Sequence, residues 1–135
     1  MIYLDTSAFV KLVWAEPETD ALGRFLTRRP ASSLVSSSLL TVETRRAVQR
    51  EDPSALSRAD ILLTRIGRIG MTASIVESAS RLPERSLRSL DAIHLATALL
   101  LRADLDAVVT YDKRLAAVAE AHDLPVDSPG IAANE

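Results

Sequence analysis

The stretch Met-Ile-Tyr-Leu-Asp-Thr-Ser at residues 1–7 sets the pattern from which the fold of this chain is predicted. Its apolar run ends on an acid, which is typical of a short buried strand at residues 1–5. Thr6 and Ser7 then supply hydroxyl groups of the kind that begin helices. The segment Asp-Ala-Val-Val-Thr-Tyr-Asp-Lys at residues 106–113 repeats the pattern. Both stretches therefore predict a strand that is followed at once by a helix, with an acid at the junction.

Outward from these two stretches, short apolar runs alternate with segments of helical periodicity. Strands are expected at residues 1–5, 34–36, 68–71, 106–110 and 124–127. Helices are expected at residues 6–14, 18–28, 39–49, 52–66, 75–82, 89–102 and 113–121. Such alternation indicates βαβ crossovers and a parallel sheet that helices cover on both faces. We predict one α/β domain over residues 1–135, in which residues 128–135 form a frayed tail.

The composition limits the chemistry that a site in this chain can use. The 135 residues are 47% hydrophobic and 25% charged, which suits one soluble domain with its own core. The absence of cysteine excludes disulfides, a thiolate zinc site and a cysteine nucleophile. With only two histidines, any metal site favours oxygen ligands and a hard cation such as Mg²⁺ or Mn²⁺. We expect a cytoplasmic protein, because the sequence has neither a secretory signal nor a membrane-spanning stretch.

The overall charge does not point to a nucleic-acid binder. The net charge is −2 and the pI is near 5.7. Only two of the sixteen basic residues are lysines, and this preference for arginine suits phosphate contacts but is equally explained by coding bias. A nucleic-acid function must therefore be argued from local groups of residues.

Four acids, which we call the acidic quartet, lie where a parallel sheet can bring them together: Asp5, Glu43, Asp91 and Asp112. Each has a local explanation, since the three aspartates lie where acids cap helices and Glu43 is most simply a solvated helix residue. Close carboxylates raise one another's pKa unless a cation neutralises them. The quartet therefore implies either a bound divalent metal or no cluster at all, and the sequence leaves both open.

Four segments together resemble the PIN-domain family, and most closely its VapC-like toxins. They are IYLDTS at residues 2–7, TVE at 41–43, SLDAIHLATA at 89–98 and VTYDKRL at 109–115. The resemblance runs through the whole chain in order, and the segment at 89–98 is its most specific part. It implies a three-layer α/β/α sandwich around a parallel sheet. It also implies a Mg²⁺-dependent endoribonuclease that hydrolyses RNA phosphodiester bonds as the toxin of a toxin–antitoxin pair.

The resemblance implies roles for single residues as well. The acidic quartet matches the acids that hold metal and act in catalysis in this family. Within it we expect Asp5 and Asp91 to be the direct Mg²⁺ ligands, and the other two acids to bind a second ion or to act through water. Ser7 and Thr110 match hydroxyl positions of the catalytic site, which orient a metal-bound water or a ligand carboxylate.

The resemblance finally implies the partners of the chain. The substrate would be RNA, with tRNA or rRNA as plausible targets, and a VapB-like antitoxin would occlude the active site. A homodimer is expected, and no membrane is involved. The alternative is a catalytically weak PIN-like module that binds RNA or regulates without cutting.

Residues near the acids carry weaker predictions. His94 lies one helical turn after an acid of the quartet, and we interpret it as a packed core histidine rather than as a hydrogen-bond partner of the acids. Arg46 and Arg50 share a helix face with Glu43 and could contact an RNA phosphate or an acidic group of the antitoxin. The stretch 81–88, rich in arginine, is a weaker candidate for substrate contact.

Three other α/β families require residues that this chain lacks. A haloacid-dehalogenase-like phosphotransferase needs a second aspartate two residues after the first, where this chain has Ser7. A response-regulator receiver needs an acid on a central strand, and the segment 69–72 has none. A dinucleotide-binding domain needs a glycine-rich turn after the first strand, and residues 5–7 contain no glycine.

Overall fold

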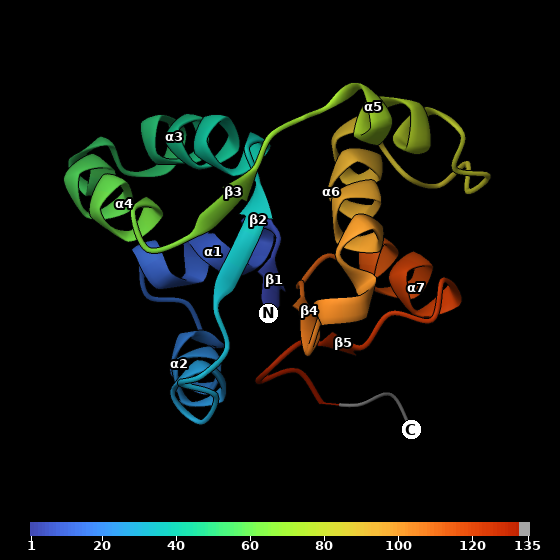
Figure 1. Ribbon diagram of the computed structural model, residues 1–135. Helices are drawn as coiled ribbons and strands as arrows, with labels where there is room; N and C mark the ends of the chain where they lie inside the picture. Colours follow the sequence, from blue (N-terminus) through green and yellow to red (C-terminus); the bar gives the residue numbers. More distant parts are fainter. Residues whose placement is uncertain (133–135) are drawn as a thin grey trace.

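The computed structural model describes residues 1–132 and contains one parallel sheet with helices on both sides (Figure 1). The strands are β1 (Ile2–Leu4), β2 (Leu34–Ser37), β3 (Gly67–Ile69), β4 (Ala107–Val109) and β5 (Val126–Asp127). The α-helices are α1 (Thr6–Val13), α2 (Thr19–Thr27), α3 (Leu39–Glu51), α4 (Leu56–Leu63), α5 (Ala73–Ser80), α6 (Ser89–Leu100) and α7 (Lys113–Ala121). Two 3₁₀ turns are η1 (Pro53–Ala55) and η2 (Arg102–Asp104). The strand order is β3-β2-β1-β4-β5, and every neighbouring pair is parallel.

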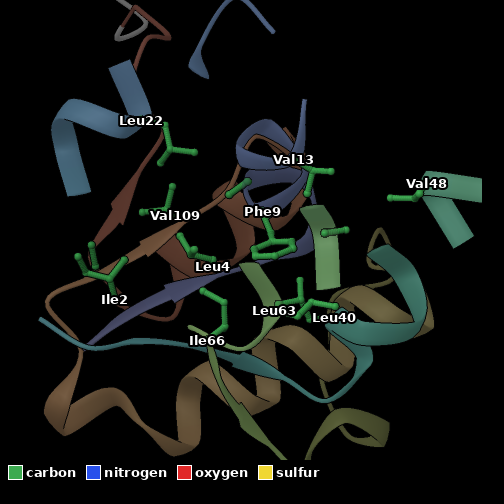
Figure 2. Close-up of a cluster of buried hydrophobic side chains, with 13 residues drawn as sticks. Ile2, Leu4, Phe9, Val13, Leu22, Leu40, Val48, Leu63, Ile66 and Val109 are labelled. Carbon is green, nitrogen blue, oxygen red and sulfur yellow. The ribbon is translucent and has the colours of Figure 1, made fainter. Parts of the chain in front are cut away.

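The central strand β1 is buried on both faces, and each face of the sheet carries its own layer of helices. Successive side chains of a strand point to opposite faces, so Ile2 and Leu4 join one core cluster and Tyr3 joins the other. The first cluster packs under α1 to α4 and is drawn in Figure 2. The second packs under α6 and α7, and α5 packs against α6. These two layers confirm the predicted α/β/α sandwich.

The strand order places three strand-to-helix junctions side by side. β1 lies between β2 and β4, with Tyr3 opposite Val35 and Leu4 opposite Val109. Because these strands are parallel, α3, α1 and α7 all begin at the same edge of the sheet. We call it the carboxyl edge, and it is the edge at which α/β proteins place their functional groups.

All the predicted strands and helices are found, but one predicted helix is divided into two elements. The helix expected at residues 52–66 consists of η1 followed by α4, because the side chain of Asp52 accepts from the Ser54 amide at 3.2 Å and caps a separate 3₁₀ turn. Among residues 1–132, none of the helices has the length and apolar character needed to cross a membrane.

The frayed tail expected from residue 128 is wrong for its first residues. The Ser128 hydroxyl donates to the Thr110 carbonyl at 2.6 Å, and the Tyr111 hydroxyl donates to the Pro129 carbonyl at 2.7 Å. Gly130 has a φ of 92° and lies so close to α2 that an added Cβ would be 3.1 Å from the Ala21 Cβ. Hydrogen bonds and packing therefore hold this segment in place. Residues 133–135 of the expected tail lie outside the described residues.

Candidate active site

Asp5 lies at the end of β1, where its carboxylate joins three groups of the carboxyl edge. One oxygen, Oδ1, accepts from the Ala8 amide at 3.0 Å and from the Ser7 hydroxyl at 2.7 Å. The other, Oδ2, accepts from the Thr110 hydroxyl at 2.6 Å. Asp5 is only 4% exposed, and burial raises its pKa although these hydrogen bonds act in the opposite direction. Asp5 is therefore the helix cap that its position predicts, and also a buried carboxylate.

The hydroxyls of Ser7 and Thr110 join the two neighbouring junctions of β1 and β4. Besides donating to Asp5, the Ser7 hydroxyl accepts from the Tyr111 amide at 2.9 Å. The Thr110 hydroxyl accepts from the Asp112 amide at 3.1 Å. Asp112 in turn caps α7, since its Oδ1 accepts from the backbone amides of the first turn of that helix. The two hydroxyls thus hold Asp5 and Asp112 in a fixed relation.

Glu43 lies on α3 but points toward the rest of the site. Its Oε1 accepts from the Thr6 hydroxyl at 2.8 Å and is 2.7 Å from the His94 Nε2. The side chain is 23% exposed. Burial alone would raise its pKa, but the contacts with His94 and Thr6 outweigh burial and lower it. The interpretation of Glu43 as a solvated helix residue is therefore wrong.

His94 is a packed core histidine, as predicted, and also the hydrogen-bond partner that the sequence interpretation set aside. It is 2% exposed, and its two ring nitrogens have different partners. Nε2 faces Glu43, and Nδ1 is 2.7 Å from the Tyr3 hydroxyl, which is itself buried. Burial also holds the pKa of Tyr3 well above its usual range. Neither Tyr3 nor Thr6 was selected from the sequence as a partner of the quartet.

Asp91 lies in the first turn of α6 but does not cap it, because the capping position belongs to Arg88 and α6 has no side-chain cap. Its carboxylate is half-buried. Burial raises its pKa, and the negative charge of Asp112 raises it further, with smaller contributions from Asp5 and Glu43. Asp91 therefore lies within electrostatic reach of the other three acids of the quartet.

A cleft of about 280 Å³ lies beside two of these acids. Its lining residues are Arg88, Asp91, Asp112, Lys113 and Arg114. Arg88 belongs to the 81–88 stretch that the sequence named as a substrate contact, and it lies at this cleft. Arg46 and Arg50 are exposed, and within residues 1–132 their side chains form hydrogen bonds only with neighbours on their own helix, Gln49 and Glu51.

The oxygen atoms at the carboxyl edge suit a hydrated hard cation. Within residues 1–132, no three acids or histidines lie close enough together to hold one ion by direct contact. In the same range, no lysine or arginine forms an ion pair with the quartet. Glu43 Oε2, Asp112 Oδ2 and both oxygens of Asp91 accept no hydrogen bond from the described protein groups. Because Mg²⁺ keeps several waters and takes one or two carboxylates directly, this set of ligands fits it.

Comparisons with known proteins place this chain in one family. The PIN domain family model matches residues 2–121. Ribonuclease VapC35 of Mycobacterium tuberculosis is 46% identical over 132 residues, which cover 96% of this chain and 98% of that protein.

Two solved structures share the fold. One is the M. tuberculosis toxin VapC20, described as cleaving the sarcin–ricin loop, with a TM-score of 0.70 and 22% identity over 87% of this chain and 95% of its own. The other is Rickettsia felis VapBC2 bound to a promoter DNA fragment, with a TM-score of 0.71 and 20% identity over 94% of this chain and 98% of its own. The family match over most of the chain and the near full-length identity to a VapC ribonuclease lead to one conclusion: the chain belongs to the PIN-domain family.

Proposed function

We propose that this protein is a metal-dependent endoribonuclease, the toxin of a toxin–antitoxin pair. The observation that carries the proposal is the gathering of four carboxylates from four elements at one edge of the sheet, without an ion pair to a lysine or arginine among the described residues. Relatives named ribonuclease VapC at 46% identity support the same reaction.

The residues of the quartet would hold one or two Mg²⁺ or Mn²⁺ ions, with Asp5 and Asp91 as direct ligands. A bound divalent ion supplies a water of lowered pKa and relieves charge on the phosphoryl group. Ser7 and Thr110 orient the Asp5 carboxylate toward this task through their hydrogen bonds. The basic side chains of the cleft would contact phosphates on either side of the scissile bond; they are Arg88, Lys113 and Arg114.

The partners follow from the relatives rather than from the site. Solved neighbours include VapBC2 and a toxin–antitoxin complex of Klebsiella pneumoniae, which supports a VapB-like antitoxin as partner of this chain. A structured RNA such as tRNA or rRNA is the proposed target class, and the described action of VapC20 on the sarcin–ricin loop is one example of such a target. A homodimer and a cytoplasmic location stay predictions.

The second candidate function is a PIN-like module that binds RNA or regulates without cutting it. The complete quartet argues against this candidate, because a purely binding role does not need four acids near a phosphate-binding cleft. Net charge repulsion with RNA phosphates would even weaken such binding.

Cleavage of labelled total RNA, with and without Mg²⁺, tests the proposal. We expect Mg²⁺-dependent cleavage by the wild type, and a loss of more than about 100-fold in Asp91→Asn and in Asp5→Asn, because each removes a ligand charge. Asp91→Asn is the cleaner variant, since Asp91 caps no helix. Asp20→Asn, an exposed change on α2, is the matched control and should cleave like the wild type.

Two results would contradict the nuclease. Equal cleavage by the wild type and both variants would show that the activity does not come from the quartet. RNA binding without any cleavage, with or without added Mg²⁺ or Mn²⁺, would favour the binding module instead.

A further inference from the structure

Three side chains from β1, α6 and α3 form a continuous chain of hydrogen bonds that ends on one acid of the quartet. The Tyr3 hydroxyl is 2.7 Å from His94 Nδ1, and His94 Nε2 is 2.7 Å from Glu43 Oε1. These contacts join residues that are 91 and 51 positions apart in the sequence. Only Glu43 is partly exposed, because Tyr3 and His94 are 1% and 2% exposed.

The hydrogen-bonding chemistry of Glu43 and Tyr3, the two partners of His94, decides which ring nitrogen of His94 carries the hydrogen. An ionised carboxylate only accepts hydrogen bonds, so Nε2 must donate to Glu43. In a neutral imidazole the other nitrogen is then an acceptor, and the Tyr3 hydroxyl donates to Nδ1. The donors thus run in one direction, from Tyr3 through His94 to Glu43.

The orientation of the His94 ring is also determined by packing. The rings of Tyr3 and His94 meet edge to face, with centroids 5.9 Å apart and planes at 82°. A phenylalanine at position 3 would fill the same buried space on the strand but could not donate to Nδ1. The hydroxyl of Tyr3 therefore contributes the hydrogen bond to His94 Nδ1, which packing of the ring alone would not provide.

Glu43 needs such support because of where it lies. Asp5 and Asp112 are held by backbone amides at the start of their own helices. Glu43 lies within α3, where no free amide is available to it, and its long side chain has several rotatable bonds. Its Oε1 is held instead by Thr6 and His94, and its Oε2 accepts no hydrogen bond from residues 1–132.

We propose that Tyr3 and His94 are positioning residues, which hold Glu43 Oε1 through a fixed histidine tautomer and so leave Oε2 oriented for a divalent ion. This inference rests on the proposed function in that it needs a metal at the carboxyl edge. It assigns no proton transfer to His94. Outer partners of metal ligands commonly change metal affinity by about 10–100-fold when they are removed.

The first test is the tautomer itself, read from the ¹⁵N chemical shifts and two-bond ¹H–¹⁵N couplings of His94 in the wild-type protein at neutral pH. We expect the Nε2–H tautomer in the wild type, and a mixed or altered pattern in Tyr3→Phe. His122, the other histidine, pairs with Glu84 at 2.6 Å and serves as an internal reference that Tyr3→Phe should not change. A Nδ1–H tautomer or an imidazolium at His94 in the wild type would overturn the assignment.

The second test is the affinity for Mn²⁺ alone, measured by calorimetry without RNA. His94→Leu should weaken binding about tenfold or more, since it removes the donor to Glu43. His94→Gln carries an amide donor at a similar reach and should stay within about threefold of the wild type. The matched control is His122→Gln, which should bind like the wild type.

These variants separate the inference from the function on which it rests. Equal Mn²⁺ affinity in the wild type, His94→Leu and Tyr3→Phe would overturn the positioning role and leave the metal site intact. A wild type that binds no Mn²⁺ would overturn the proposed function, and the inference with it. If His94→Leu does not fold, the tautomer in the wild type and the pair Tyr3→Phe and His94→Gln still decide the question.

Discussion

The loop between α1 and α2 and the carboxyl edge of the sheet both gather carboxylates, but they balance the negative charge differently. At the loop, the Nζ of Lys11, from the last turn of α1, is 3.0 Å from Glu16 Oε2 and 2.9 Å from Glu18 Oε2. Lys11 is 7% exposed, and its ammonium lies 4.6 Å from the centre of the Tyr111 ring. At the carboxyl edge, within residues 1–132, no lysine or arginine pairs with the acidic quartet.

The difference fits a structural role for the Lys11 cluster and the metal-binding role that we propose for the quartet. The ammonium of Lys11 neutralises much of the charge of the two carboxylates beside it. Its hydrogen bonds with them, and that of Thr19 with the Lys11 carbonyl, hold the start of α2 against α1. At the carboxyl edge the pKa of Asp91 is raised, first by burial and then by the negative charge of Asp112, with smaller contributions from Asp5 and Glu43. The chain therefore pairs a cation of its own with the carboxylates of one region and, among the described residues, forms no such lysine or arginine ion pair with the carboxylates of the other.

The largest effect on stability is expected in the loop. Lys11→Met leaves Glu16 and Glu18 close together without their cation, and we expect the thermal unfolding midpoint to fall by roughly 5 °C, between the effects of an exposed and a fully buried pair. Differential scanning fluorimetry measures this. Lys113→Met changes the other lysine of the chain, which is exposed, and is the matched control. Equal midpoints for the two variants would mean that the Lys11 cluster contributes nothing.

An effect of no more than about this size is expected when a divalent cation is added at the carboxyl edge. Transfer from a chelator to Mg²⁺ at about ten times the dissociation constant should stabilise the wild type by about 1.4 kcal/mol, because the ion binds only the folded state. Asp91→Asn should lose most of this gain, and Asp20→Asn should keep it. The same rise of the unfolding midpoint in Asp91→Asn would place the ion somewhere other than the quartet.

The smallest effect is expected from removing one buried charge in the absence of metal. Burial raises the pKa of Asp5 in the folded state, so the folded state holds that proton more tightly than the unfolded state does. Stability from this source is complete below the usual carboxyl pKa and is lost as the pH rises through the folded pKa of Asp5.

Asp5→Asn should therefore raise the unfolding midpoint of the chelator-treated protein at neutral pH, because it removes the buried charge and asparagine also caps helices. The gain should shrink toward acidic pH, where the wild-type Asp5 is protonated as well. A pH scan of both proteins checks this, and a variant that is less stable than the wild type at neutral pH would contradict it.

Much of the fold could be predicted because its signals are local. The stretch at residues 1–7 and its repetition at 106–113 identify two junctions, since a short apolar run and a helix cap each depend on a few consecutive residues. For the same reason Asp5 and Asp112 were correctly predicted as caps. The tail was less predictable: Ser128 and Pro129 are held by Thr110 and Tyr111, which are 18 residues away.

The site was predictable only in part. The resemblance to a family identified the quartet. Nothing in the sequence indicated that Glu43 contacts Thr6 and His94, because these residues are 37 and 51 positions away from it. The interpretation of Glu43 as a solvated helix residue was wrong. Helix periodicity predicts which face of a helix a residue lies on, but it does not predict which other helix packs against that face. His94 was correctly placed in the core, and its two hydrogen bonds were missed for the same reason.

By itself, the sequence determined the alternation of strands and helices, the parallel sheet and the aspartates at the strand ends, because caps and apolar runs act over a few residues. Only the tertiary structure decided that Tyr3, His94 and Thr6 converge on Glu43, because that convergence depends on how β1, α1, α3 and α6 pack. It also decided that Lys11 is buried in its own cluster, away from ion pairing with the quartet. Packing over long sequence separations sets both arrangements, and among the described residues it leaves the quartet without an ion pair to a lysine or arginine.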